Sequence, residues 1–167
     1  ILNFVFSQLV NRGGGVPFYS LQLITGLVLW NFFAEGSTAG LNALWSKGSI
    51  IGKIYFPRWI VVVSSTLNSF LVFLGNLLIL VAFFAYYQKA VTLSGLAFFA
   101  LYIVFIYLGI LAFSLFTAPL FLRFRDLAPI WEVVAQMLFF AAPIIYPLSQ
   151  LPVKFQPWLL LNPIGML

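Results

Sequence analysis

The sequence predicts an all-α fold, a polytopic bundle of transmembrane helices in a single domain over residues 1–167, from three observations. The chain is 63% hydrophobic and 7% charged, whereas a soluble domain carries roughly 25% charged residues. Four windows of 21 to 33 residues contain no charged side chain, and a helix needs roughly 20 apolar residues to cross a bilayer. The run from Phe70 to Phe84 is apolar on nearly every side, unlike the alternating polarity of a transmembrane β-strand.

Each window predicts a helix, because a backbone inside lipid must satisfy its own hydrogen bonds. The first complete span follows the breaker Gly13 to Pro17, the second follows Pro57, and the fourth has Pro129 near its start, where proline is tolerated. The chain begins and ends inside apolar runs, so we expect a fragment truncated at both ends. The expected spans are 1–10 (partial), 18–44, 59–87, 94–118, 128–147 and 159–167 (partial).

Lysine and arginine set the expected orientation, because basic loops stay in the cytoplasm. One side of the membrane, formed by loops 45–58 and 119–127, holds Lys47, Lys53, Arg58, Arg123 and Arg125. The other side holds three basic residues, Arg12, Lys89 and Lys154. We therefore expect the side with five basic residues to be cytoplasmic.

The residue types exclude several functions. The chain has no cysteine and no histidine, which excludes a disulfide framework, a thiolate metal site and histidine-based catalysis. Its net charge of +5 comes from basic residues scattered between apolar runs, a pattern typical of membrane loops rather than of a nucleic-acid-binding face. Gly13-Gly14-Gly15 lacks the Lys-Ser/Thr of a phosphate-binding loop. We expect no cofactor, no metal and no nucleic-acid partner for this chain.

Loop 45–58 contains a short amphipathic segment. Ile50, Ile51 and Ile54 fall on one helical face, and Lys47 and Lys53 lie elsewhere on the segment. One interpretation is a docking element for a cytoplasmic partner. The other is an interfacial anchor whose lysines meet anionic headgroups, and the residues alone favour the anchor.

The second cytoplasmic cluster is Arg123-Phe124-Arg125-Asp126. It is open to two interpretations. The residues could form a gate at the cytoplasmic mouth that holds anionic substrate groups. Alternatively, they set the orientation and form a local surface Arg–Asp pair, which contributes little to stability.

Polar residues occupy the first half of span 59–87. Ser65, Ser69 and Asn76 are spaced by four and seven residues and share a helix face, and Asn68 lies close by. Polar side chains in a span face protein or water, so these residues predict either a substrate path or helix–helix packing, with packing favoured. Gly36-xxx-Gly40 likewise predicts a packing contact.

Two further features leave alternatives open. Glu35 lies toward the cytoplasmic end of span 18–44, where an interfacial acid is favoured over a buried proton relay. Five of the nine prolines fall between Pro143 and Pro163. This proline-rich stretch forms either short helices that dip into the outer face or an ordinary extracytoplasmic loop.

Five strings carry a resemblance to a known family: YSLQLITGLVLWNFF from Tyr19, KIYFPR from Lys53, FRDL from Phe124, PIIYP from Pro143 and NP from Asn162. In their order and spacing the chain resembles the membrane (permease) subunit of bacterial ATP-binding-cassette polysaccharide exporters, the type-2 permease family. Members of this family export O-antigen, capsular polysaccharide or teichoic acid. The resemblance covers essentially the whole chain.

The resemblance implies a multi-pass subunit of the bacterial cytoplasmic (inner) membrane with six spans, about five of them present here with the start of the sixth. It implies a homodimer of permeases, membrane lipid around it, a lipid-linked polysaccharide as substrate, and cytoplasmic nucleotide-binding ATPase subunits that hold ATP and Mg. It also implies roles for two groups of residues. The ATPase-coupling segment contains Lys47, Ile50, Ile51, Lys53, Ile54, Phe56 and Arg58. The extracytoplasmic gate contains Pro143, Tyr146, Pro147, Pro152 and Pro163. The candidate cytoplasmic mouth, Arg123, Arg125 and Asp126, aligns with the FRDL string of the family, which assigns it no role.

The expected function is export of a lipid-linked polysaccharide, powered by ATP hydrolysis in a partner subunit. The polar face with Ser65, Asn68, Ser69 and Asn76 is then a candidate substrate path. A type-2 permease for a drug or lipid is the closest alternative. A membrane-embedded glycan or lipid transferase is a further alternative, but the chain has only three acids, well separated, and no histidine.

Overall fold

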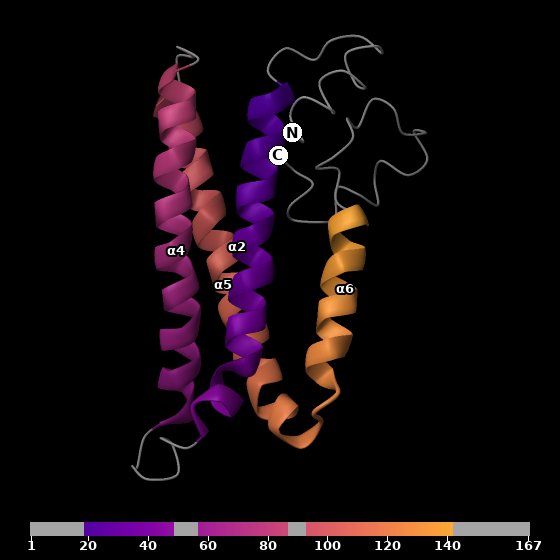
Figure 1. The fold of residues 1–167 in the computed structure, drawn as a ribbon. Helices are drawn as coiled ribbons and strands as arrows, with labels where there is room; N and C mark the ends of the chain where they lie inside the picture. The colour runs from indigo at the N-terminus through magenta and orange to yellow at the C-terminus, as the bar shows by residue number, and fades with distance from the viewer. Residues whose placement is uncertain (1–18, 49–56, 87–92, 142–167) are drawn as a thin grey trace.

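In the computed structural model, residues 19–48, 57–86 and 93–141 are described, and they form four helices. These are Tyr19–Ser46 (α2), Arg58–Tyr86 (α4), Leu93–Arg123 (α5) and Leu127–Ala141 (α6). No strand occurs in these three ranges. The helices run alternately up and down, and the ends of α2 and α5 lie at the same end of the bundle as the starts of α4 and α6 (Figure 1). The all-α fold class is confirmed.

The long apolar helices turn most of their surface outward. Arg58–Ala82 and Gly95–Arg123 are long and apolar enough to cross a membrane, yet only 22% and 17% of their most apolar windows are buried. Leu78 and Phe105 are among the large apolar side chains that these helices expose. A core helix of a soluble protein buries such residues, so a surface of this kind requires hydrocarbon as its solvent.

Helix α2 lies at the centre of the bundle and contacts α4, α5 and α6. Its Phe32 ring stacks on Phe73 of α4 at a centroid distance of 4.4 Å, inside a cluster that Ile106 and Ile110 of α5 complete. A second cluster nearer the other end joins Leu44 of α2 to α4 and α5. Because lipid tails are as apolar as these side chains, close packing rather than water exclusion holds membrane helices together.

The glycines of α2 allow the closest of these approaches. A Cβ atom on Gly36 would lie 3.1 Å from two side-chain carbons of Ile110. A Cβ atom on Gly40 would overlap the side chain of Ser114 and lie 3.0 Å from Cγ2 of Thr66. The predicted packing role of Gly36 and Gly40 is therefore confirmed, with α5 as the principal partner.

The predicted loop 119–127 is wrong over its first five residues. Helix α5 continues through Pro119 to Arg123, and the connection to α6 is a tight turn at residues 124–126. Proline removes one backbone donor, but membrane helices tolerate it where neighbouring groups and packing compensate. Here Ala118 and Phe121 are buried on either side of Pro119, and Thr117 donates a 2.8 Å hydrogen bond to the carbonyl of Phe113.

The other boundaries lie close to the predicted ones. Helices α2, α4 and α5 begin within one residue of expected spans 18–44, 59–87 and 94–118, and α2 ends two residues later than expected. Pro57 directly precedes α4, and Pro129 is the third residue of α6. Residues 142–147 of the expected span 128–147, and the partial spans 1–10 and 159–167, lie outside the described residues.

Candidate functional site

Charged side chains gather at the end of the bundle where α2 ends, α4 begins, and α5 turns into α6. Lys47, Arg58, Arg123, Arg125 and Asp126 all lie there. The structure thus brings together described residues from the two loops that were predicted to share one side of the membrane. The other coupling-segment residues, Ile50, Ile51, Lys53, Ile54 and Phe56, fall outside the described part of the chain, as do the gate residues Pro143, Tyr146, Pro147, Pro152 and Pro163.

Lys47 ties the start of the coupling segment to α4. Its ammonium Nζ lies 3.2 Å from Oγ of Ser65 and 3.4 Å from Oγ of Ser64, and it can donate to both hydroxyls. Ser64 in turn donates to the carbonyl of Val61. These hydrogen bonds join the residue that follows α2 to the first turns of α4.

Trp45 connects the α5–α6 turn to the end of α2. The guanidinium carbon of Arg125 lies 4.7 Å from the centre of the Trp45 ring, and Phe121 meets the same ring edge-on at 6.2 Å. A cation placed over a tryptophan face is attracted by the electron density of the ring. The sequence did not single out Trp45, because only the tertiary fold brings residues 45 and 125 together.

The arginines of the cytoplasmic cluster stand over aromatic rings. Arg123 lies over Phe124 at 5.8 Å, while Arg125 contacts Trp45. In the described part of the chain, no ion pair joins Asp126 to either arginine, so the surface Arg–Asp pair considered from the sequence does not form. Instead, the carbonyl of Asp126 accepts the first hydrogen bond of α6, from Ile130. Its carboxylate thus lies at the helix N-terminus, where negative charge is stabilising.

Trp131 fastens α6 to the rest of the bundle. Its Nε1 donates a 3.2 Å hydrogen bond to Oγ of the fully buried Ser37 on α2. Its ring lies 4.2 Å from that of Phe113 on α5 and 6.2 Å from that of Phe33 on α2. Trp131 therefore contacts both α2 and α5. The sequence did not reveal this packing role, because no periodic pattern marks Trp131.

The predicted path residues on α4 separate into two groups. Ser69 is only 2% exposed and lies on the same face as Thr66 and Phe73, which pack against α2. Ser69 therefore belongs to the packing interface, the alternative that the sequence left open. Asn68 is exposed, whereas Ser65 and Asn76 are half-buried at the edge of this interface.

Glu35 lies in the second half of α2. It is exposed and lies 11 residues before Ser46, the last residue of α2, which is roughly 16 Å along a helix. That it is an interfacial acid rather than a buried proton relay stays a prediction.

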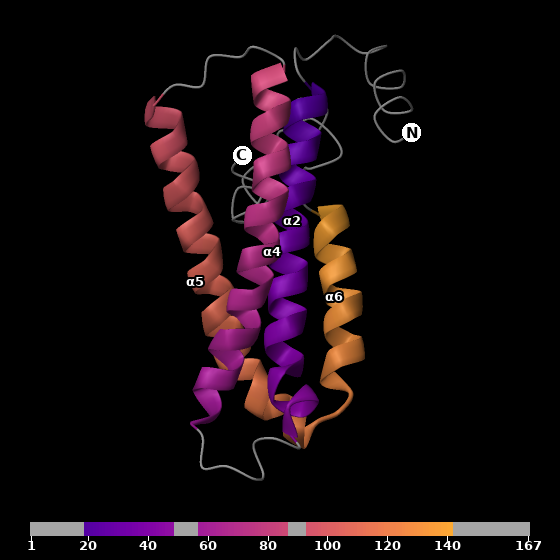
Figure 2. The ribbon, with the colours of Figure 1, turned by 60° about the vertical axis from the view of Figure 1, so that its left-hand side comes forward.

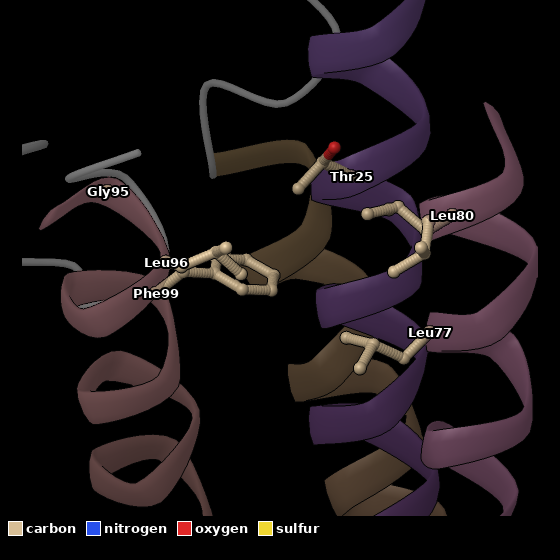
Figure 3. Close-up of a pocket in the computed structure, with 7 residues that line it drawn as sticks. Thr25, Leu77, Leu80, Gly95, Leu96 and Phe99 are labelled. Carbon is tan, nitrogen blue, oxygen red and sulfur yellow. The ribbon is translucent and has the colours of Figure 1, made fainter. Parts of the chain in front are cut away.

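An apolar pocket lies toward the opposite end of the bundle, where α5 leans away from α4 (Figure 2). It has a volume of about 380 Å³. Leu77, Leu80 and Phe99 point into it from α4 and α5, and Thr25 borders it on α2 (Figure 3). Among the described residues, no charged side chain lines it, and this part of its lining suits an apolar chain.

Fold and site together define an integral membrane protein: a helical bundle with an apolar exterior and a basic end. The model of the ABC-2 type transporter family matches residues 1–166. The chain belongs to this family, which confirms the resemblance seen in the sequence and makes the chain an integral protein of the inner membrane.

The chain is similar to two O-antigen export system permease proteins RfbA of Klebsiella pneumoniae, with 32% and 31% identity over 153 residues. Both alignments cover 90% of this chain and 58% of the relative. It is also similar to the protein of the same name from Myxococcus xanthus, with 27% identity over 135 residues, or 80% of this chain and 51% of the relative. The chain therefore spans little more than half the length of the relatives it matches.

Proposed function

We propose that this chain is part of the permease subunit of an ABC transporter that exports a lipid-linked polysaccharide across the cytoplasmic membrane. The observation that carries the proposal is the similarity to O-antigen export permeases along 90% of the chain. The chain itself catalyses no reaction in this proposal. ATP and Mg bind in a separate nucleotide-binding subunit, which docks on the cytoplasmic end, and a second permease copy completes the transporter.

The contacts at the cytoplasmic end support a mechanical coupling. The segment from Lys47 to Arg58 joins the end of α2 to the start of α4, and Lys47 is bonded to Ser64 and Ser65. The contact of Arg125 with Trp45 extends this link to the α5–α6 turn. When the ATPase subunits close, a push on the coupling segment moves all four described helices through these two contacts.

Cytoplasmic mouth residues Arg123, Arg125 and Asp126 are all exposed. Arginine recognises phosphate oxygens with high geometric specificity. Exposed guanidinium groups beside the bundle therefore suit the anionic linkage of a lipid-linked glycan as it enters. The proline-rich residues 143–163 are proposed as the extracytoplasmic gate on the strength of the sequence resemblance alone.

Two experiments test this function. In a strain that lacks the full-length gene, reintroducing it restores surface polysaccharide if the proposal is correct. The full-length protein, purified in detergent, is expected to bring an ATP-binding subunit with it. Normal surface polysaccharide in the deletion strain, together with loss of drug or lipid efflux, favours the alternative cargo. Glycan or lipid transfer by the purified protein without an ATPase favours the enzyme alternative.

A further inference from the structure

A polar face runs along α2 between the side that contacts α4 and the side that contacts α6. Asn31, Glu35, Thr38 and Asn42 are spaced by four, three and four residues, so they share one helix face. Asn31 and Glu35 are exposed, and Thr38 and Asn42 are half-buried. Within the described helices, no hydrogen bond or ion pair engages the side chain of Asn31 or Glu35, while Asn42 donates only to the carbonyl of Thr38.

Helix α4 presents polar residues at matching levels. Gly40 lies against Thr66, and Phe32 stacks on Phe73, which fixes the antiparallel register of α2 and α4. In this register Thr38 is level with Asn68, and Asn31 is within half a turn of Asn76. At the cytoplasmic end, Asn42 reaches the level of Ser64 and Ser65, where Lys47 is bound.

The two polar faces adjoin each other on one side of the α2–α4 pair, and the strip that they form is called the groove below. Going once around the circumference of α2, Gly36 faces α5, Phe32 comes next and faces α4, and Glu35 comes after Phe32. Going around the circumference of α4, Phe70 faces Tyr107 of α5, and Phe73 comes next and faces α2. Beyond Phe73, on the side away from α5, come Asn76, Ser65 and Asn68. The polar strip therefore lies on the side of the α2–α4 pair away from α5, and this side of the ribbon faces the viewer in Figure 1.

The groove extends along most of the thickness of the hydrocarbon core. From Asn31 to Lys47 it follows 16 residues of α2, or roughly 24 Å of the approximately 30 Å thickness of the hydrocarbon core. On the outer surfaces of α4 and α5, by contrast, the exposed side chains include Leu71, Leu78 and Phe105. One carboxylate and two amides on α2, together with two amides on α4, are incompatible with lipid in the hydrocarbon core and require water or polar partners.

We propose that the groove formed by Asn31, Glu35, Thr38 and Asn42 of α2 and Ser65, Asn68 and Asn76 of α4 is a wall of the translocation path and binds a hydroxyl-rich saccharide chain. The proposal rests on the proposed export function and names the surface that contacts the cargo. Amides and hydroxyls both donate and accept hydrogen bonds, as sugar hydroxyls do. A series of such groups without alternating charge lets a repeating polymer slide from one set of partners to the next.

These 167 residues contain no cysteine, which allows a direct test once any cysteine elsewhere in the full-length protein has been replaced by serine. Single variants Asn31→Cys, Thr38→Cys and Asn68→Cys are made in the full-length protein, reconstituted in lipid with its ATP-binding subunit. The matched controls are Leu78→Cys and Phe105→Cys, which are exposed to lipid on α4 and α5. A charged, membrane-impermeant methanethiosulfonate is the probe, because only a hydrated thiolate reacts with it.

The groove variants are expected to react at least about 10-fold faster than the lipid-facing controls. Oligosaccharides released from the surface polysaccharide of the same strain are expected to slow this reaction. Groove thiols as unreactive as the controls would overturn the proposal, because another helix or lipid then covers the groove. Rapid reaction that the oligosaccharides do not slow would also overturn it. The labelling experiment does not require transport. If the proposed export function is wrong, the deletion strain shows it through normal surface polysaccharide, independently of the labelling result.

Discussion

Gly40 lies where α2, α4 and α5 meet, and the space for its missing side chain is already filled by Ser114 and Thr66. The variant Gly40→Ala is expected to destabilise the protein by about 1–3 kcal/mol, because an overpacked interior must move backbone or side chains. Thermal unfolding of the full-length protein in detergent measures this.

Gly109→Ala on α5 is the matched control, since nothing lies within 4 Å of the methyl group it adds. Alanine is preferred over glycine in a helix by about 1 kcal/mol, so this control is expected to hold or raise the unfolding temperature. Equal losses in the two variants would contradict the packing account of Gly40.

Trp131 is the second residue whose role can be isolated. Replacing it in Trp131→Phe keeps an aromatic ring against Phe113 but removes the Nε1 donor to Ser37. The buried hydroxyl of Ser37 can still donate to the carbonyl of Ala34, so the expected loss is about 0.5–1.5 kcal/mol. Trp59→Phe is the control, because Trp59 is 59% exposed. A loss no larger than that of the control would show that the hydrogen bond contributes nothing.

At the scale of elements, the contact of Arg125 with Trp45 links the α5–α6 turn to α2 and to the coupling segment. An exposed cation–π contact is worth about 0.5–1 kcal/mol. Its loss in Arg125→Gln is therefore expected to lower export by roughly 2- to 5-fold, while ATPase binding is retained. Export per ATP hydrolysed, in membrane vesicles, is the measurement.

Arg123→Gln removes the same charge two residues away, but Arg123 lies over its neighbour Phe124 and not over α2. Because the proposed function also places Arg123 at the cytoplasmic mouth, some loss of export is expected here too, and the additional loss in Arg125→Gln measures the link to Trp45. If both variants lose export equally, the charge of the cytoplasmic mouth matters and the link to Trp45 does not. Combining Arg125→Gln with Trp45→Leu is expected to add little to the effect of either change alone.

The helices were predictable because their signal is local. Long charge-free windows and breakers such as Pro57 placed the starts of α2, α4 and α5 to within one residue. The end of α5 was not predictable, because proline normally ends a helix and only tertiary burial of Phe121 shows why this one continues. The spacing of Ser65, Ser69 and Asn76 correctly gave a shared face, but not which part of it packs against α2. Trp45 and Trp131 gave no signal, since their partners lie far away in the sequence.

At the scale of the whole molecule, polarity is distributed by position in the bundle. The central helix α2 carries Asn31, Glu35 and Asn42, whereas α4 and α5 expose leucine and phenylalanine to their surroundings. This arrangement reverses that of a soluble bundle, in which the exterior is polar. In the proposed path, the cargo therefore runs beside α2, on the side of the α2–α4 pair away from α5.

The direction of transport depends on which side of the membrane holds the basic end of the bundle. Gly48 follows α2 at that end, and Gly95 lies in the first turn of α5 at the other; both are exposed. In the full-length protein, with any cysteine outside these 167 residues replaced by serine, Gly48→Cys is expected to react with an impermeant thiol reagent in inside-out vesicles but not in intact spheroplasts. Gly95→Cys, if it reacts at all, is expected to react only in spheroplasts. The reason is that lysine and arginine are retained in the cytoplasm, and five of the eight belong to the Gly48 side. Labelling of Gly48→Cys from the outside would place the coupling segment beyond the reach of any cytoplasmic ATPase and would end the export proposal, even if every helix contact described above were correct.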